Sequence, residues 1–131
     1  MTSHKRPLDS SLVQEIVTVS HGNLARVVEL IQQEPALVNA AWDWGGGDWE
    51  TPLGAAAHTG SREIAVYLLA HGARLDLFAA AMLGKLSIVR TALETFPEAR
   101  QVRGPHGISL LDHAKAGGEA SRAVVEYLEA T

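Results

Sequence analysis

Apolar residues recur along the chain at helical spacing, in two kinds of segment that alternate. One kind is short and rich in alanine, as in residues 55–57 and 79–81, and a glycine follows it. The other kind comes after the glycine and places apolar residues three or four positions apart, as with Ile64, Tyr67 and Leu68. This spacing gathers apolar side chains on one face of a helix. The pattern therefore predicts pairs of short helices, each pair joined at a glycine.

The same order of alanines, glycine and apolar helix occurs four times. The turn glycines are Gly22, Gly60, Gly84 and Gly118, and the steps between them are 38, 24 and 34 residues, which average 32. Small alanine side chains let the first helix of each pair pack closely on its neighbours, and a left-handed glycine ends that helix. A repeat of this length indicates a stack of helical units that bury their apolar faces against one another.

One of the four segments closely resembles the ankyrin repeat consensus. Residues 51–76 carry the Thr-Pro-Leu opening, an alanine pair, the turn glycine, a Leu-Leu pair and a Gly-Ala ending. Thr51 is expected to cap the first helix, and Pro52 suits its first turn. The histidine that the family usually has after Thr-Pro-Leu is Gly54 here. The resemblance runs from about residue 12 to residue 128, but it is close only in this unit.

The resemblance implies an all-α fold, an ankyrin-type solenoid of helix–turn–helix repeats in a single domain over residues 1–131. The expected repeats cover roughly residues 8–41, 50–76, 77–103 and 104–131. Two irregularities stand out. One hairpin finger is missing, because the chain runs from Gly72 directly into the next helix, for which Asp76 is the predicted N-cap. The loop before residue 50 is longer than the family's and is rich in tryptophan and glycine.

All three tryptophans, Trp42, Trp44 and Trp49, lie in this long loop around three consecutive glycines. A hairpin is expected, with Trp42 and Trp44 on one face. Three interpretations remain open: the tryptophans cover apolar surface left bare by the missing finger, they form a lid over a ligand, or one is buried while another is presented. Aromatic rings beside Asp43 and Asp48 suit a flat or cationic molecule, or a peptide.

Exposed positions of the first helices are expected to line a concave face. Alignment on the turn glycines places His58, Met82 and His113 there, and Phe78 would border a pocket under the loop. His58 and His113 lie two repeats apart, about 20 Å by the spacing of packed helices, so a shared metal ion is not expected. His106 is expected in a surface turn. The predicted ligand or partner contacts are Trp42, Trp44, Asp48, Trp49, His58, Phe78, Met82 and His113.

Composition narrows the classes of partner. The net charge of −4 argues against nucleic acid and anionic lipid, both of which attract basic surfaces. The absence of cysteine excludes disulfides, thiolate catalysis and cysteine-ligated zinc. No apolar run reaches the roughly 18 residues that cross a bilayer, and the start is too polar for a signal peptide. A cytoplasmic, soluble protein without metal or cofactor is expected.

Common catalytic motifs are also absent, including the phosphate-binding loop, the dinucleotide fingerprint and the nucleophile elbow. We therefore expect a monomeric, non-catalytic binding module that recognises a protein or peptide through its concave face and Trp-rich loop. The alternative is a small-molecule-binding protein or enzyme whose pocket is formed by that loop, His58 and the inner helices. Acid–base catalysis would then fall to His58 with Asp43 or Asp48.

Overall fold

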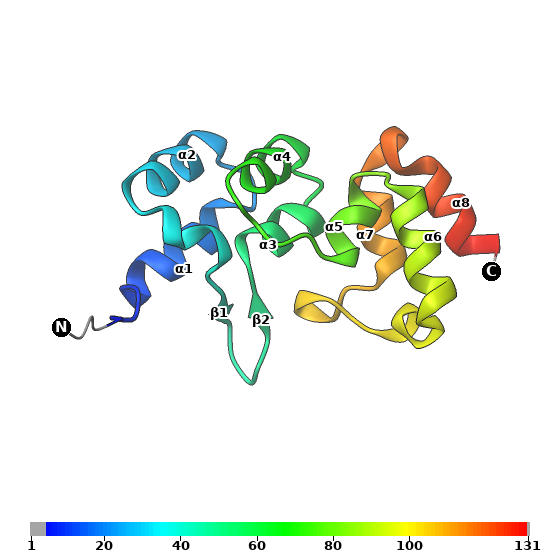
Figure 1. Cartoon of the computed structure of the whole chain (residues 1–131), viewed down its shortest axis with the longest axis horizontal. Coiled ribbons are helices and arrows are strands. Elements are labelled where there is room, and N and C mark those ends of the chain that lie inside the picture. The colour runs from blue at the N-terminus through cyan, green and yellow to red at the C-terminus, as the bar shows by residue number, and fades with distance from the viewer. Residues whose placement is uncertain (1–4, 131) are drawn as a thin grey trace.

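The computed structural model describes residues 5–130, most of which are helical. Within this range eight α-helices follow one another in four pairs (Figure 1). They are α1 (Ser10–Val19), α2 (Leu24–Gln33), α3 (Pro52–His58), α4 (Arg62–Ala70), α5 (Leu77–Met82), α6 (Leu86–Thr95), α7 (Leu110–Ala116) and α8 (Arg122–Ala130). Short 3-10 helices are η1 (Pro35–Asn39), η2 (Pro97–Gln101), η3 (Pro105–Gly107) and η4 (Gly118–Ser121). Residues 1–4 and 131 of the predicted domain lie outside the described residues.

Helix starts are fixed by side chains that cap the first turn. The Thr51 side chain accepts a hydrogen bond from the N–H of Gly54 before α3, and Asp76 accepts one from Ala79 before α5. These two predicted caps are confirmed. Asp9, Asn23 and Ser109 cap α1, α2 and α7 in the same way. Each cap satisfies a backbone donor that the helix leaves unpaired, and so it sets where the helix begins.

The turn glycines end the first helix of three pairs. Gly60, Gly84 and Gly118 have φ of +68°, +78° and +66°, the left-handed conformation that the sequence predicts. The prediction is wrong for Gly22, whose φ is not positive. There the chain leaves α1 through a tight turn in which the N–H groups of Gly22 and Asn23 donate to the Val19 carbonyl.

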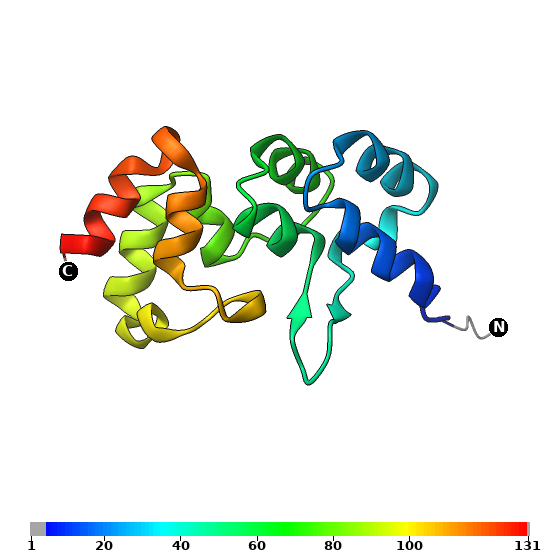
Figure 2. The same ribbon diagram turned by 180° about the vertical axis from the view of Figure 1, so that it is seen from behind.

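The first helices of the pairs (α1, α3, α5 and α7) form one row, in which each contacts the next. In both views α2 and α4 lie on one side of α1 and α3, whereas α6 and α8 lie beyond α7 at the C-terminal end (Figures 1 and 2). The buried core divides at α5. One cluster, with Ile16, Leu30 and Leu68, fills the N-terminal half, while another, with Leu110 and Val124, fills the C-terminal half. No helix within residues 5–130 is both long and apolar enough to cross a membrane.

A two-stranded hairpin adds β structure to the expected all-α fold. Strand β1 (Trp42–Asp43) pairs antiparallel with β2 (Trp49–Glu50), so the predicted hairpin is confirmed. The Asp43 carboxylate closes its turn by accepting hydrogen bonds from Gly45 N–H at 2.8 Å and Gly47 N–H at 3.0 Å. The hairpin projects beyond the helices in both views (Figures 1 and 2). The link from α4 to α5 contains no strand, as the missing finger predicts.

Candidate functional site

Glu50, the last residue of the hairpin, is a buried carboxylate whose side chain has no exposed surface. It passes alongside α3 at Gly54, where a Cβ would lie 3.6 Å from Cγ of Glu50, at ordinary contact distance. The indole N–H of Trp44 donates to Oε1 of Glu50 at 2.9 Å. An ionised carboxylate removed from water costs several kcal/mol unless its charge is balanced. The groups around Glu50 must therefore supply positive charge or hydrogen-bond donors.

Three imidazole rings surround this carboxylate. Nε2 of His21 lies 3.2 Å from Oε1 of Glu50, while Nε2 of His58 and Nε2 of His106 lie 2.9 and 3.3 Å from Oε2. His21 follows α1, His58 is the last residue of α3, and His106 belongs to η3. The rings of His21 and His106 lie 5.0 and 5.2 Å from that of His58, between centroids. We call these four residues the His–Glu cluster.

Two of the rings are held by their other nitrogen. Nδ1 of His21 lies 2.9 Å from the Val17 carbonyl oxygen, which only accepts hydrogen bonds, so Nδ1 is the donor. Nδ1 of His106 lies 2.7 Å from Oδ2 of Asp48, and the His106 backbone N–H donates to Oδ1 at 2.8 Å. In a neutral ring the proton then resides on Nδ1, and Nε2 turns a lone pair toward Glu50.

The centre of the cluster is left without hydrogen bonds. Oε2 of Glu50 and Nε2 of His58 are both buried, and neither has a hydrogen-bond partner, although they lie 2.9 Å apart. Buried polar atoms are normally satisfied, so an orphaned pair at this distance calls for an explanation. Lone pairs of a carboxylate and of imidazoles that face one another need a cation or shared protons between them.

Burial and hydrogen bonding shift two pKa values here. Burial lowers the pKa of His58, with the neighbouring His21 and His106 acting in the same direction, although the Glu50 charge opposes them. The pKa of Asp48 is lowered, first by the hydrogen bond from the His106 backbone N–H. Asp48 thus stays ionised beside His106, and His58 tends toward the neutral form that offers a lone pair.

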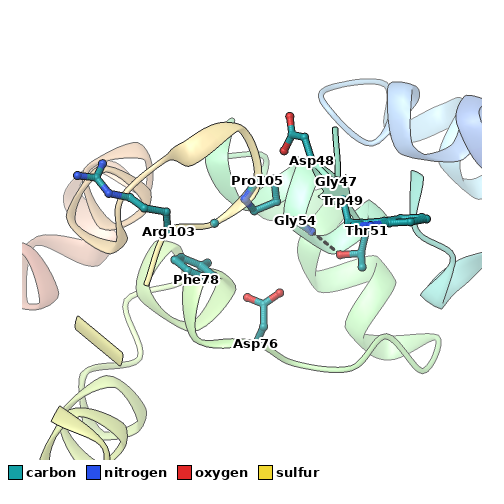
Figure 3. A pocket seen from close by; sticks show the side chains of 10 residues that line it. Gly47, Asp48, Trp49, Thr51, Gly54, Asp76, Phe78, Arg103 and Pro105 are labelled. Atoms are coloured by element: carbon teal, nitrogen blue, oxygen red, sulfur yellow. Dashed lines mark hydrogen bonds between the residues drawn. The ribbon is translucent and has the colours of Figure 1, made fainter. Parts of the chain in front are cut away.

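An open pocket of about 360 Å³ lies beside the hairpin (Figure 3). Its walls include Trp49 from the hairpin, Asp76 and Phe78 from the start of α5, and Pro105 from η3. Arg103 also lines it, but its guanidinium donates to the Gly107 carbonyl and points away from the cavity in Figure 3. The pocket therefore offers mainly aromatic and acidic groups.

Residues 48–79 match the family model for the ankyrin repeat. The chain contains an ankyrin repeat. It begins in the hairpin, continues through α3 and α4, and ends in α5, so it supplies Glu50 and His58 of the cluster. Ankyrin repeats are generally protein-binding modules. No curated protein matches the chain in sequence.

The structure brings only some of the predicted contact residues together. His58 of the ankyrin repeat lies in the His–Glu cluster, and Asp48 and Trp44 hold two of its members. Trp42 instead packs against the N-terminal core, while Trp49 is 60 % exposed. The arrangement comes nearest to the third interpretation of the loop, one tryptophan buried and another presented, but Trp42 is half-buried and not buried.

The expectation that Met82 and His113 face a groove is wrong, because both are fully buried. Helix α5 lies between α3 and α7, and the Met82 carbonyl oxygen packs directly against Gly117 at the end of α7. The ring of Phe78 lies 4.7 Å from that of His113, between centroids, and Gly104 covers the ring's edge. Phe78 does line the pocket, but Met82 does not.

Sequence reasoning missed His21, Glu50 and His106 as site residues. The sequence predicts His106 in a surface turn, and that turn is present with a φ of +61° at His106, but the residue is bonded to Asp48 of the hairpin. His21 lies one position before the turn glycine Gly22, and His58 lies two positions before the turn glycine Gly60. This shared place beside a turn glycine is the signal in the sequence that links the two histidines. No local spacing links His106 to the others, since 48 positions separate it from His58.

Proposed function

We propose that the ankyrin repeat is one of four in a single ankyrin-type solenoid over the whole chain. The four helix pairs fall within the expected ranges 8–41, 50–76, 77–103 and 104–131, and their first helices lie in one row. The Trp-rich hairpin is then an enlarged finger. The short link from Gly72 to Asp76 takes the place of a finger that the third unit lacks.

The proposed activity is non-catalytic recognition of a protein or peptide partner by the hairpin and the adjoining pocket. The observation that carries it is Trp49, a large aromatic side chain that is 60 % exposed on a projecting strand. Tryptophan is among the residues most enriched in the binding hot spots of protein interfaces. The turn is held by Asp43, so Trp49 is presented with little loss of conformational freedom on binding.

The lining of the pocket defines the partner's chemistry. Trp49 and Phe78 provide aromatic surface, and Asp76 provides a carboxylate beside it, whereas the Asp48 carboxylate is held by His106. Such a surface suits a peptide that presents an apolar side chain next to a lysine or arginine, and the net charge of −4 favours the approach of a basic partner. Met82 and His113 take no part, because they are buried.

The test is selection of peptides from a displayed library on the full chain, followed by affinity measurement. Trp49→Ser should weaken binding of the selected peptides by at least about tenfold, a loss of about 1.4 kcal/mol or more, as expected for a central aromatic contact. Phe96→Ser is the matched control, because Phe96 is 62 % exposed and lies at the end of α6, away from the pocket. Equal losses in the two variants, or selected peptides without basic residues, would count against this surface.

A small molecule in the same pocket is the second candidate, and the cavity itself is what favours it. Catalysis there by His58 with Asp43 or Asp48 has less support. The Asp43 carboxylate closes the hairpin turn, and Asp48 holds His106 through two hydrogen bonds. Binding of a metabolite that Trp49→Ser abolishes, with no peptide selected, would favour this candidate.

A further inference from the structure

The proposed partner surface does not use the His–Glu cluster, and the buried centre of the cluster needs another explanation. We propose that His21, Glu50, His58 and His106 bind one divalent transition-metal ion, for which Zn²⁺ is the best match. The proposal is independent of any protein partner. In this proposal the bound ion links the hairpin to the helices.

The donor atoms converge as metal ligands do. One nitrogen or oxygen from each of the four residues lies within 4.8 Å of all the others. A tetrahedral Zn²⁺ ion with bonds of about 2.0–2.1 Å holds its donors about 3.4 Å apart. The distances from Oε2 of Glu50 to Nε2 of His58 and Nε2 of His106, 2.9 and 3.3 Å, are close to this value, and Nε2 of His21 lies 3.2 Å from the other carboxylate oxygen, Oε1. Small side-chain shifts would place an ion among the four donors.

The hydrogen-bonding pattern favours an ion over shared protons. Nδ1 of His21 donates to a carbonyl and Nδ1 of His106 pairs with a carboxylate, so the neutral rings present bare Nε2 atoms. Oε2 of Glu50 and Nε2 of His58 are buried and unsatisfied. An ion between them would satisfy both atoms at once and would balance the buried charge of Glu50.

The surrounding residues resemble the outer partners of known metal sites. Metal-bound histidines usually donate their second nitrogen to a carboxylate or a backbone carbonyl, which fixes the ring orientation. Asp48 does this for His106, and Val17 does it for His21. Trp44 likewise donates to Oε1 of Glu50 and leaves Oε2 for the ion. Imidazole and carboxylate donors suit zinc, and four protein ligands favour a structural site over a catalytic one.

Bound metal would tie together segments distant in the sequence. The ligands come from the turn after α1, the hairpin, the end of α3 and η3. Because an ion that binds only the folded state stabilises it, the melting temperature should rise with zinc concentration. The hairpin and η3, which form two walls of the pocket, should become more protected from hydrogen exchange.

The experiment uses the full chain without an affinity tag, stripped with a chelator and dialysed. Zn²⁺ is then titrated in competition with a chromophoric chelator, and bound metal is counted by elemental analysis. One tightly bound ion per chain is expected, together with a rise in melting temperature. Co²⁺ serves as a spectroscopic probe, because its visible absorption is strong in tetrahedral sites and weak in octahedral ones.

Three variants and a control locate the site. His106→Asn removes one ligand but tolerates the φ of +61°, which asparagine adopts more readily than most residues. Glu50→Gln removes the charged ligand while keeping an acceptor for Trp44. Asp48→Asn keeps all four ligands and should weaken zinc binding by about 10–100-fold. His71→Gln is the control, because His71 is also held through Nδ1 by a backbone carbonyl but lies outside the cluster.

Each outcome of these measurements either supports the metal site or overturns it. Loss of affinity larger in His106→Asn and Glu50→Gln than in Asp48→Asn, with His71→Gln unchanged and all variants folded by circular dichroism, supports the site. The proposal is overturned if the folded wild-type chain takes up no stoichiometric Zn²⁺, Co²⁺, Ni²⁺, Mn²⁺ or Fe²⁺. It is equally overturned if binding persists unchanged in both ligand variants. Peptide selection with Trp49 is scored separately and decides nothing about the metal.

Discussion

Nε2 of His58 lies 2.9 Å from Oε2 of Glu50, although the two residues flank opposite ends of helix α3. The carboxylate passes α3 at Gly54, where a Cβ would lie 3.6 Å from Cγ of Glu50, at ordinary contact distance. Pro105 uses the same space, since a Cβ at Gly54 would lie 3.4 Å from its Cγ. Gly54 is thus the position at which the hairpin, α3 and η3 meet, and a larger residue there would separate them.

The effect of a substitution at Gly54 on stability should therefore depend on the size of the new side chain. Gly54→Ala adds a Cβ at ordinary contact distance and gains helix propensity, so stability should rise by up to about 1 kcal/mol. Gly54→Leu should lower it by about 1–3 kcal/mol through overpacking against Glu50 and Pro105. Urea unfolding of both variants in the presence of a chelator measures the difference. Equal stability of the two variants would mean that Glu50 and Pro105 do not occupy this space.

The buried ring of His113 should make the folded protein less stable in mild acid. Burial lowers its pKa from the ordinary 6.5, against the opposing hydrogen bond to Ser109 and the charges of Asp76 and Asp112. The folded state therefore takes up its proton at a lower pH than the unfolded chain. Stability contributed by the neutral ring is complete above pH 6.5 and falls as the pH drops through this value toward the folded pKa.

Urea unfolding at pH 7.5 and pH 5 with chelator present should show this decrease. His113→Asn keeps a donor for the Ser109 carbonyl but cannot titrate, so its decrease should be smaller than in the wild type. His58 shifts in the same direction and accounts for part of the slope in both proteins. The same slope in His113→Asn and wild type would show that the buried ring does not titrate with folding.

The turn glycines give a prediction about packing. A Cβ on Gly84 would collide with the Ala120 carbonyl oxygen, whereas a Cβ on Gly118 would meet nothing within 4 Å. Both residues have positive φ, so the conformational cost of alanine, about 1–2 kcal/mol, is shared. Gly84→Ala should lower the free energy of unfolding by at least about 1 kcal/mol more than Gly118→Ala. Thermal unfolding of the two variants checks this, and equal losses would mean that the turn after α5 and η4 are less closely packed.

The parts of the molecule that sequence reasoning predicted well are those set by local chemistry. Thr51 and Asp76 cap their helices, and the alanine-rich segments form the close-packed first helices. Capping and helix formation can be predicted here because both depend on residues a few positions apart. The His–Glu cluster depends instead on which turns the packed repeats bring together. His21 and His106 are 85 positions apart, and only the stacking of the helices and the return of η3 place both beside Glu50.

The exposure of Met82 and His113 could not be predicted from the sequence for a related reason. Alignment to a repeat gives the face of a helix, but it does not show the tertiary packing: α5 lies between α3 and α7 with the Met82 carbonyl oxygen against Gly117, and Gly104 covers the ring of His113. Those contacts exist because glycine at these positions allows backbone to approach closely. The sequence shows the glycines without showing which side chain they will cover.

The tryptophans allow the last prediction, which separates the roles of the three rings. Trp42 packs on the core, Trp44 donates to buried Glu50 and is 38 % exposed, and Trp49 is 60 % exposed. Variants with two of the three changed to phenylalanine leave a single emitter each. Acrylamide quenching should be strongest for Trp49, intermediate for Trp44 and weakest for Trp42, because a ring in water is more accessible to the quencher. The emission of Trp49 should lie furthest to the red, because water surrounds its ring with a more polar medium. A protected Trp49 would mean that the hairpin folds back onto the helices in solution, and the surface proposed for partner binding would then be covered.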